Sequence, residues 1–185
     1  MARMPAALAI RCTSRGPIIF RQKRAGRGGE PFQIYKLRTM RHGTSTQSHL
    51  DMIRGELSNP AEVVGTGNVF KISNNPDVLP VGRALRRLSI DELPQLVNVL
   101  KGDMSIVGPR PVPVYEHEMY EPRYQARSLV RPGLTGLWQV SGRNNLDTTQ
   151  MLELDLQYLA RRSIRTDVSI LVRTPLAVLN GGGAR

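Results

Sequence analysis

The sequence predicts an α/β protein of the α+β type, a compact and mostly helical domain with a small β-hairpin or sheet. Three observations support this class. The 185 residues match the length of one domain, and the 40% hydrophobic and 22% charged residues are typical of globular proteins with a buried core. Apolar residues recur mainly at helical spacing, and one glycine-punctuated pair of strand-like runs stands near the N-terminus. We therefore expect residues 1–185 to form a single domain.

A basic hairpin is the first predicted element. Residues 17–20 and 32–37 are rich in β-branched and aromatic side chains and flank the glycine-rich segment 26–29, a pattern typical of two strands joined by a turn. The glycine segment has neither P-loop spacing nor the GxGxxG order, so it predicts a hairpin turn rather than a phosphate cradle. In the second strand, alternation places Phe32 and Lys36 on one face.

Apolar residues at helical spacing predict helices along the rest of the chain. One helix is expected to begin near Leu93, with Pro94 at its first position, and to end at Gly102. The last helix is expected to carry an apolar stripe and to have Asp167 as its N-cap. The prolines of residues 108–113 predict a stiff extended loop, because proline fixes φ and disfavours helix in the preceding residue. The remaining predictions are helices at 46–58, 114–127, 149–162 and 167–179, irregular structure at 60–80, and a strand or turn at 133–142.

The positive charge of the chain is concentrated near its N-terminus. The whole chain carries a net charge of +11, and residues 1–41 hold ten Lys and Arg against one acid, Glu30, a net of +9. A polyanion, a phosphate-bearing substrate or an anionic membrane surface is therefore the expected partner of this region. No stretch approaches the ~20 apolar residues of a membrane-spanning helix.

Composition also excludes several classes of protein. Aromatic residues make up only 5% of the chain, too few for a general single-strand binder, and no nucleic-acid motif is present, so no specific nucleic-acid partner is expected. The single cysteine, Cys12, excludes an internal disulfide framework and any multi-cysteine zinc site. The sequence carries no signal for the oligomeric state.

Two adjacent acids, Asp91 and Glu92, form the first candidate site. One interpretation is structural, since Ser89 and Glu92 have the spacing of a capping box and acids favour the first turn of a helix. The other is functional, because helix N–H groups and the preceding Arg86 and Arg87 attract phosphate. Asp91 would then be a nucleophile and Glu92 a metal ligand or proton carrier. Neighbours on a helix diverge by ~100°, so the two carboxylates would flank a metal ion rather than share a proton.

Three cationic residues form further candidates. Arg110 lies between Pro109 and Pro111, and this rigidity suits a guanidinium that meets phosphate with two parallel hydrogen bonds, although a solvated loop arginine is the alternative. Lys36 and Arg38 follow one another at alternate positions near the end of the second strand. They are candidates for phosphate binding, or they only discourage pairing at a sheet edge.

Asp155 is unusual because it falls on the apolar stripe of its predicted helix. A buried carboxylate needs a partner. The expected partner is an arginine such as Arg143 or Arg162, which would make Asp155 structural, or else Asp155 orders a phosphate-binding arginine or a metal.

Five stretches of the chain carry a more specific signal. They are FRQ (20–22), YKLRTM (35–40), LRRLSIDELPQLVNVLKGDMS (85–105), VGPRP (107–111) and PGLTGLWQV (132–140). Together and in this order they resemble the bacterial sugar transferases, the monotopic polyprenyl-phosphate phosphoglycosyl transferases. The resemblance runs from about residue 16 to residue 184.

The resemblance implies a reaction, namely transfer of a sugar 1-phosphate from a nucleotide sugar, usually a UDP-sugar, to polyprenyl (undecaprenyl) phosphate. This step initiates assembly of exopolysaccharide, O-antigen or glycoconjugates. By the matching motif, Asp91 and Glu92 would be catalytic, with a phospho-aspartyl sugar intermediate on Asp91 and Mg²⁺ held by the pair. The implied substrate- or phosphate-binding residues are Lys36, Arg38, Arg86, Arg87, Arg110, Gln139, Arg143 and Asp155.

The N-terminus departs from the family pattern. Family members enter the membrane through a long apolar segment, whereas only residues 5–10 are apolar here, so residues 1–15 are expected to be a remnant or truncated anchor region. NNPDV (74–78) also stands where many relatives carry an Asp-Asp-Pro-Arg type of stretch. The expected location is the cytoplasmic face of the inner membrane, peripheral or monotopic, or soluble for this chain. The alternative function is a catalytically impaired scaffold subunit of a membrane glycan-assembly complex.

Overall fold

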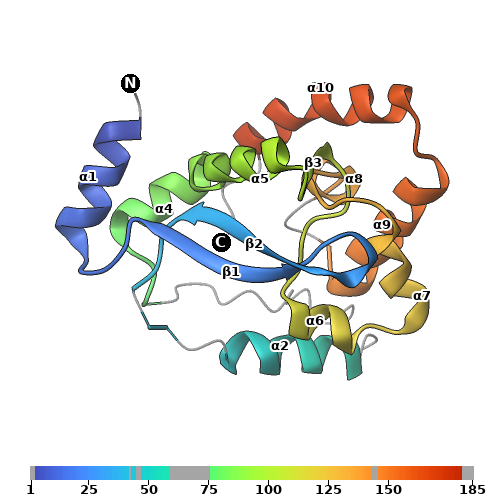
Figure 1. Ribbon diagram of the computed structural model, residues 1–185, viewed down its shortest axis with the longest axis horizontal. Coiled ribbons are helices and arrows are strands. Elements are labelled where there is room, and N and C mark those ends of the chain that lie inside the picture. The colour runs from blue at the N-terminus through green and yellow to red at the C-terminus, as the bar shows by residue number, and fades with distance from the viewer. Residues whose placement is uncertain (1–2, 42, 45–46, 59–75, 143–145, 181–185) are drawn as a thin grey trace.

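The computed structural model describes residues 3–41, 43–44, 47–58, 76–142 and 146–180. Most of these residues are helical and the sheets are small, which confirms the predicted α+β class. In Figure 1 a β-hairpin crosses the middle of the molecule, with α2 and α6 along one side and α10 along the other. The helices are α1 (Arg3–Thr13), α2 (Gln47–Ser58), α4 (Pro80–Arg87), α5 (Leu96–Lys101), α6 (Val114–Met119), α7 (Pro122–Gln125), α8 (Leu137–Val140), α9 (Thr148–Ala160) and α10 (Ile164–Asn180), with 3₁₀ turns η1 (Arg27–Gly29), η2 (Ile90–Gln95) and η3 (Ala126–Leu129).

The predicted hairpin is confirmed. Strand β1 (Ile19–Ala25) pairs antiparallel with β2 (Pro31–Leu37), and Lys36 lies opposite Phe20. The connection is η1, where Gly28 and Gly29 have φ values of 69° and 80°, which glycine adopts without steric cost. β1 begins two residues after the start of the predicted run at 17–20 and continues beyond that run through the basic residues that follow it, to Ala25. β2 packs against η2, so the hairpin lies directly beside Asp91 and Glu92.

A second, parallel pair of strands positions the proline-rich loop. Strand β3 (Ser105–Val107) pairs with β4 (Gly133–Thr135), and a Cβ on Gly133 would lie 2.2 Å from the backbone nitrogen of Gly108. Only glycine therefore allows this close approach. Residues 108–113 leave β3 as an extended loop, as predicted, and the Val112 carbonyl accepts a hydrogen bond of 2.9 Å from the Ala25 N–H. The loop that carries Arg110 is thus fixed to both sheets.

Several helix boundaries differ from the predictions because of proline. The predicted helix at 114–127 is divided into α6, α7 and η3, since Pro122 favours extended geometry in Glu121, whose ψ is 150°. The helix expected to begin near Leu93 instead starts as η2, with Pro94 inside the 3₁₀ turn, and α5 follows. Helix α4 begins at Pro80 and was missed. Most of the range predicted as irregular lies outside the described residues.

Helices α2 and α9 agree with the ranges 46–58 and 149–162 to within two residues at each end. Asp147 caps α9 in a capping box with Gln150. For α10 the predicted N-cap is wrong, because the helix already begins at Ile164, and Asp167 in its first turn accepts a hydrogen bond of 2.8 Å from the Tyr158 hydroxyl.

The apolar stripe of α10 faces away from the core. Ile170 is buried with Val107 and Tyr158 in the core cluster, whereas the stripe residues are between 41% and 73% exposed, namely Val168, Leu171, Val172, Leu176 and Leu179. None of the helices in the described part of the chain is long and apolar enough to cross a membrane.

Candidate active site

Asp91 and Glu92 lie at the start of η2, which follows α4. Ser89, in the residue position before η2, adopts φ 53° and ψ 22°, the left-handed region, and makes no side-chain capping hydrogen bond. The capping-box interpretation of Ser89 and Glu92 is therefore wrong. Both carboxylates are almost buried, with 7% and 8% of the residue surface exposed, and they face cationic side chains rather than the helix backbone.

Glu92 is held by two cations from distant parts of the chain. The Lys36 ammonium donates to Glu92 Oε1 at 3.1 Å. The Arg110 guanidinium donates to both carboxylate oxygens, to Oε2 at 3.2 Å and to Oε1 in a short contact. Burial disfavours the charge of Glu92, but Arg110 and Lys36 outweigh this and hold the pKa of its carboxyl well below the usual range. Glu92 is thus a permanent anion that fixes two phosphate-binding candidates in place.

Asp91 has the opposite environment. Its carboxylate makes no hydrogen bond or ion pair among the described residues, and burial together with the neighbouring charge of Glu92 raises its pKa. Lys36, Arg110 and Arg86 counter this shift through longer-range attraction. A carboxylate that is unpaired within the described part of the chain and lies among three cations is suited to attack an electrophilic phosphorus.

Lys36 and Arg110 are therefore the basic residues that the structure brings closest to the acids. Burial lowers the pKa of Lys36 to about 8, although Glu92 raises it in part. Only 17% of the Lys36 side chain and 23% of the Arg110 side chain are exposed. Arg86 lies near Asp91 and donates to the Thr39 hydroxyl at 2.9 Å. Poorly solvated cations of this kind attract a phosphate strongly.

A buried ion pair contacts the main chain of the Arg110 loop. Asp155 pairs with Arg127, which donates to Asp155 Oδ2 from Nε at 2.9 Å and from Nη2 at 2.6 Å. The same Nη2 donates to the Arg110 main-chain carbonyl at 2.7 Å. The expected partner of Asp155 was an arginine such as Arg143 or Arg162. The described partner is instead Arg127, and through this residue the pair is linked to the main chain of Arg110.

The other predicted site residues lie apart from the two acids. Arg38 is 3% exposed and donates to the carbonyl groups of Ser14 and Arg15, so its guanidinium ties the strand to the end of α1. Arg87 is exposed at the end of α4. Gln139 is buried in α8, beside the start of the Arg110 loop, and its Oε1 has no hydrogen-bond partner among the residues that the structure describes. Arg143 lies outside the described residues.

Two arginines of this region were missed from the sequence. Arg24 donates to the Pro111 carbonyl at 3.2 Å, and burial lowers its pKa to about 10. Arg127 was missed because nothing in its local sequence distinguishes it from other helix arginines. For Arg24 a signal exists, since it alternates with Gln22 on the hairpin face that it shares with its register partner Phe32, and a cation on an apolar face needs an acceptor.

The two acids also bear on metal binding. The described residues include no group of three or more His, Cys, Asp or Glu side chains that could hold a metal ion. Mg²⁺ is commonly held by one or two carboxylates together with substrate phosphates, and Asp91 offers an uncommitted carboxylate for this. Glu92 would contribute an oxygen only by loosening a contact with Lys36 or Arg110. The donor set fits a magnesium ion that arrives with a phosphate ligand.

The geometry gathers Lys36, Arg86 and Arg110 around two buried carboxylates, an arrangement that suits a phosphate ligand. Comparison with known proteins identifies the family. Residues 2–181 match the defining pattern of the bacterial sugar transferases, and the chain belongs to this family.

Individual relatives agree with this assignment. The chain is 43% identical over 171 residues to "Galactosyl transferase CpsE" of Streptococcus agalactiae, covering 92% of this chain and 36% of the relative. It is 41% identical to "Undecaprenyl-phosphate galactose phosphotransferase" of Salmonella typhimurium (91% of this chain, 35% of the relative). It is 42% identical to "UDP-glucose:undecaprenyl-phosphate glucose-1-phosphate transferase" of Caulobacter vibrioides (97% and 63%). The chain thus spans between about a third and two thirds of the length of these relatives.

Proposed function

We propose that this chain catalyses transfer of a sugar 1-phosphate from a UDP-sugar to polyprenyl phosphate, with Asp91 as the nucleophile and with Mg²⁺ bound at Asp91 and Glu92. The observation that carries the proposal is the contrast between the two adjacent acids. Glu92 is fully engaged by Lys36 and Arg110, whereas the Asp91 carboxylate is unpaired among the same cations. The names of the relatives supply the substrate classes.

The first half-reaction follows from the position of Asp91. A carboxylate oxygen of Asp91 attacks the phosphorus that carries the sugar, and the bond from this phosphorus to the oxygen of the uridine monophosphate (UMP) group breaks. UMP leaves with the electron pair, and the sugar phosphate is attached to Asp91 as an acyl phosphate. Lys36, Arg86 and Arg110 stabilise the negative charge that develops on the phosphate oxygens.

The second half-reaction returns the enzyme to its starting state. An oxygen of polyprenyl phosphate attacks the same phosphorus, the bond to Asp91 breaks, and polyprenyl diphosphate-sugar is released. The Asp91 carboxylate recovers its negative charge. Bound Mg²⁺ would neutralise part of the charge of the diphosphate. Glu92 positions Lys36 and Arg110 rather than moving a proton, and it loosens one of these contacts when it contributes an oxygen to Mg²⁺.

The test is an assay of UMP release with Mg²⁺, polyprenyl phosphate in detergent and a panel of UDP-sugars. The wild-type chain is expected to release UMP with at least one sugar, and Asp91→Asn to release none while its circular dichroism spectrum stays unchanged. Glu153→Gln, on the exposed part of α9, is the matched control and is expected to keep wild-type activity. Failure of every UDP-sugar would instead favour the non-catalytic scaffold.

A further inference from the structure

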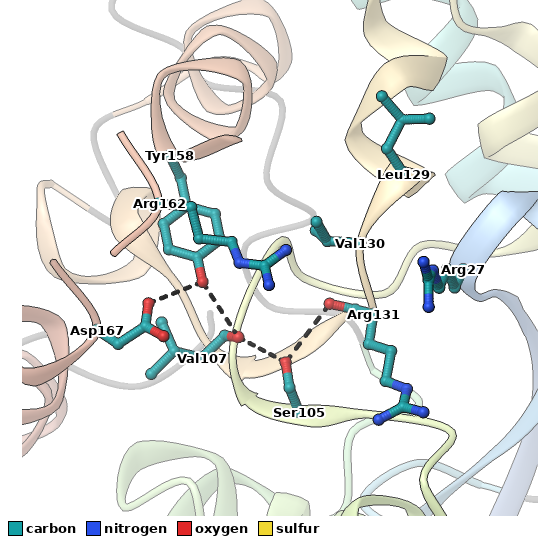
Figure 2. Close-up of a pocket in the computed structure, with 9 residues that line it drawn as sticks. All are labelled: Arg27, Ser105, Val107, Leu129, Val130, Arg131, Tyr158, Arg162 and Asp167. Atoms are coloured by element: carbon teal, nitrogen blue, oxygen red, sulfur yellow. Dashed lines mark hydrogen bonds between the residues drawn. The ribbon is translucent and has the colours of Figure 1, made fainter. Parts of the chain in front are cut away.

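A cavity of about 300 Å³ lies beside the hairpin turn, and Figure 2 shows the side chains that line it. Its apolar wall is formed by Val107 at the end of β3, by Leu129 at the end of η3 with the following Val130, and by the ring of Tyr158 from α9. A volume of this size is at the lower end of the ~300–1,000 Å³ of small-molecule sites. The cavity can therefore hold a compact ligand.

Three arginines from separate segments line the same cavity. Arg27 comes from η1, Arg131 precedes β4, and Arg162 follows α9. None of their guanidinium groups donates a hydrogen bond or forms an ion pair within the part of the chain that the structure describes. Segments about 30 residues apart or more in the sequence thus place three uncommitted arginine side chains around one cavity.

The negative charge in the cavity wall does not balance these arginines. The lining includes one acid, Asp167, which accepts the hydrogen bond from the Tyr158 hydroxyl. Three positive charges against one leave an excess of two. Guanidinium groups bind phosphate oxygens with paired, charge-assisted hydrogen bonds, and the apolar wall offers contact to an uncharged part of the same ligand.

The cavity is separate from Asp91 and Glu92. Arg27 lies at the turn of the hairpin, whereas Lys36 lies near the far end of β2. From Pro31 to Lys36 there are five residue steps, or about 17 Å at ~3.4 Å per residue, which a single phosphate cannot span. The two sites are nonetheless joined by the chain, because Val107 in the cavity wall lies three residues before Arg110, and the Val107 carbonyl accepts hydrogen bonds from Ser105 and Tyr158.

We propose that this cavity is a second phosphate site, which takes a small phosphate-bearing molecule on Arg27, Arg131 and Arg162. The phosphate could belong to a nucleotide or to free inorganic pyrophosphate, since the arginines would recognise the same group in both. A ligand here contacts the strand that leads into the Arg110 loop.

Isothermal titration calorimetry with pyrophosphate and with UMP, at physiological salt, tests this proposal. Each probe is titrated into the wild-type chain and into the double variant Arg131→Gln/Arg162→Gln. Loss of two charge-assisted contacts is expected to weaken binding by about tenfold or more. The control is Arg161→Gln/Arg165→Gln, which removes the same charge from neighbouring exposed positions outside the cavity lining, and binding there is expected to stay within about twofold of the wild type.

A third variant separates the two sites. Arg110→Gln is expected to retain the binding that the cavity variant loses. Tighter binding of UMP than of pyrophosphate would show that the apolar wall holds the nucleoside, and equal binding would show that only phosphate is recognised. Because binding rather than turnover is measured, failure of the transferase assay would leave this result intact.

Equal loss in the cavity and control variants would overturn the proposal, since it would mean nonspecific attraction to a basic surface. Absence of binding by both probes would overturn it as well. So would cavity-dependent binding to vesicles containing phosphatidylserine with no binding of either small probe, because the ligand would then be a membrane surface.

Discussion

Removal of the Asp155 carboxylate charge tests how the Arg110 loop is supported. Asp155 is 1% exposed and its partner Arg127 is 6% exposed. Asp155→Asn would leave the guanidinium buried without a counter-charge, and breaking a buried pair in this way costs about 3–5 kcal/mol of the free energy of unfolding. For a chain of 185 residues, each kcal/mol lowers the melting temperature by about 2–4 °C. We therefore expect a decrease of about 6–20 °C.

Urea unfolding followed by circular dichroism measures this free energy, and a second acid on the same helix is the control. Glu153 pairs with Arg123 at the surface, where the side chains are 41% and 55% exposed, and a pair of this kind contributes about 0–1 kcal/mol. Glu153→Gln is thus expected to have little effect. The reasoning is refuted if the two variants lose the same free energy.

A double variant separates stability from positioning. Arg127→Met/Asp155→Leu removes both charges, and such replacements are often neutral or stabilising, so stability is expected to recover toward that of the wild type. The Arg110 carbonyl has then lost its donor, and UMP release is expected to remain low. Recovery of both stability and activity would show that the pair has no positioning role.

Three further predictions concern the basic residues. Arg110→Lys is expected to reduce UMP release by about tenfold or more, because one ammonium cannot replace two parallel hydrogen bonds. Arg161→Lys, at an exposed position, is expected to have little effect. Equal losses in the two variants would contradict the phosphate-binding role of Arg110. The pKa of Lys36 is about 8, so its positive charge is present below this pH and is lost as pH rises through it. The KM for UDP-sugar is therefore expected to rise above pH 8, and Lys36→Arg is expected to displace that rise to higher pH. A KM unchanged between pH 7 and pH 10 would exclude a charge role for Lys36. In liposome flotation, the net +9 of residues 1–41 is expected to hold the chain on anionic vesicles at low salt and to release it at high salt, and salt-resistant association that needs detergent would contradict this.

The local part of the fold could be predicted from the sequence. The hairpin, α2 and α9 follow from alternation, glycine turns and helical spacing, which are properties of short segments. Pro122 divides the helix predicted at 114–127, and this break was available in the sequence but was not used. Helix α4 was missed because its eight residues, PVGRALRR, are a short run that includes a proline and a glycine, both of which disfavour a helix in local sequence.

The site was predictable in its residue types and only partly in its contacts. The rigid loop and the acid pair indicated Arg110 and Asp91, but the roles of neighbouring groups depend on pairings between segments far apart in the sequence. Arg38 carries the same positive charge as Lys36, but its guanidinium contacts the carbonyl groups of residues 14 and 15. The partner of Asp155 could not be chosen from the sequence, because the chain contains 26 Lys and Arg residues and only the packing of η3 on α9 selects Arg127.

Capture of the covalent intermediate tests the central claim, the nucleophilic role of Asp91, most directly. The chain is incubated with Mg²⁺ and the UDP-sugar that it accepts, without polyprenyl phosphate, quenched, and examined by intact-protein mass spectrometry. We expect a mass increase equal to one sugar phosphate, together with at most one UMP released per chain, and neither in Asp91→Asn. An adduct of the same mass on Asp91→Asn, or multiple turnovers of UMP release by that variant once polyprenyl phosphate is added, would contradict the account.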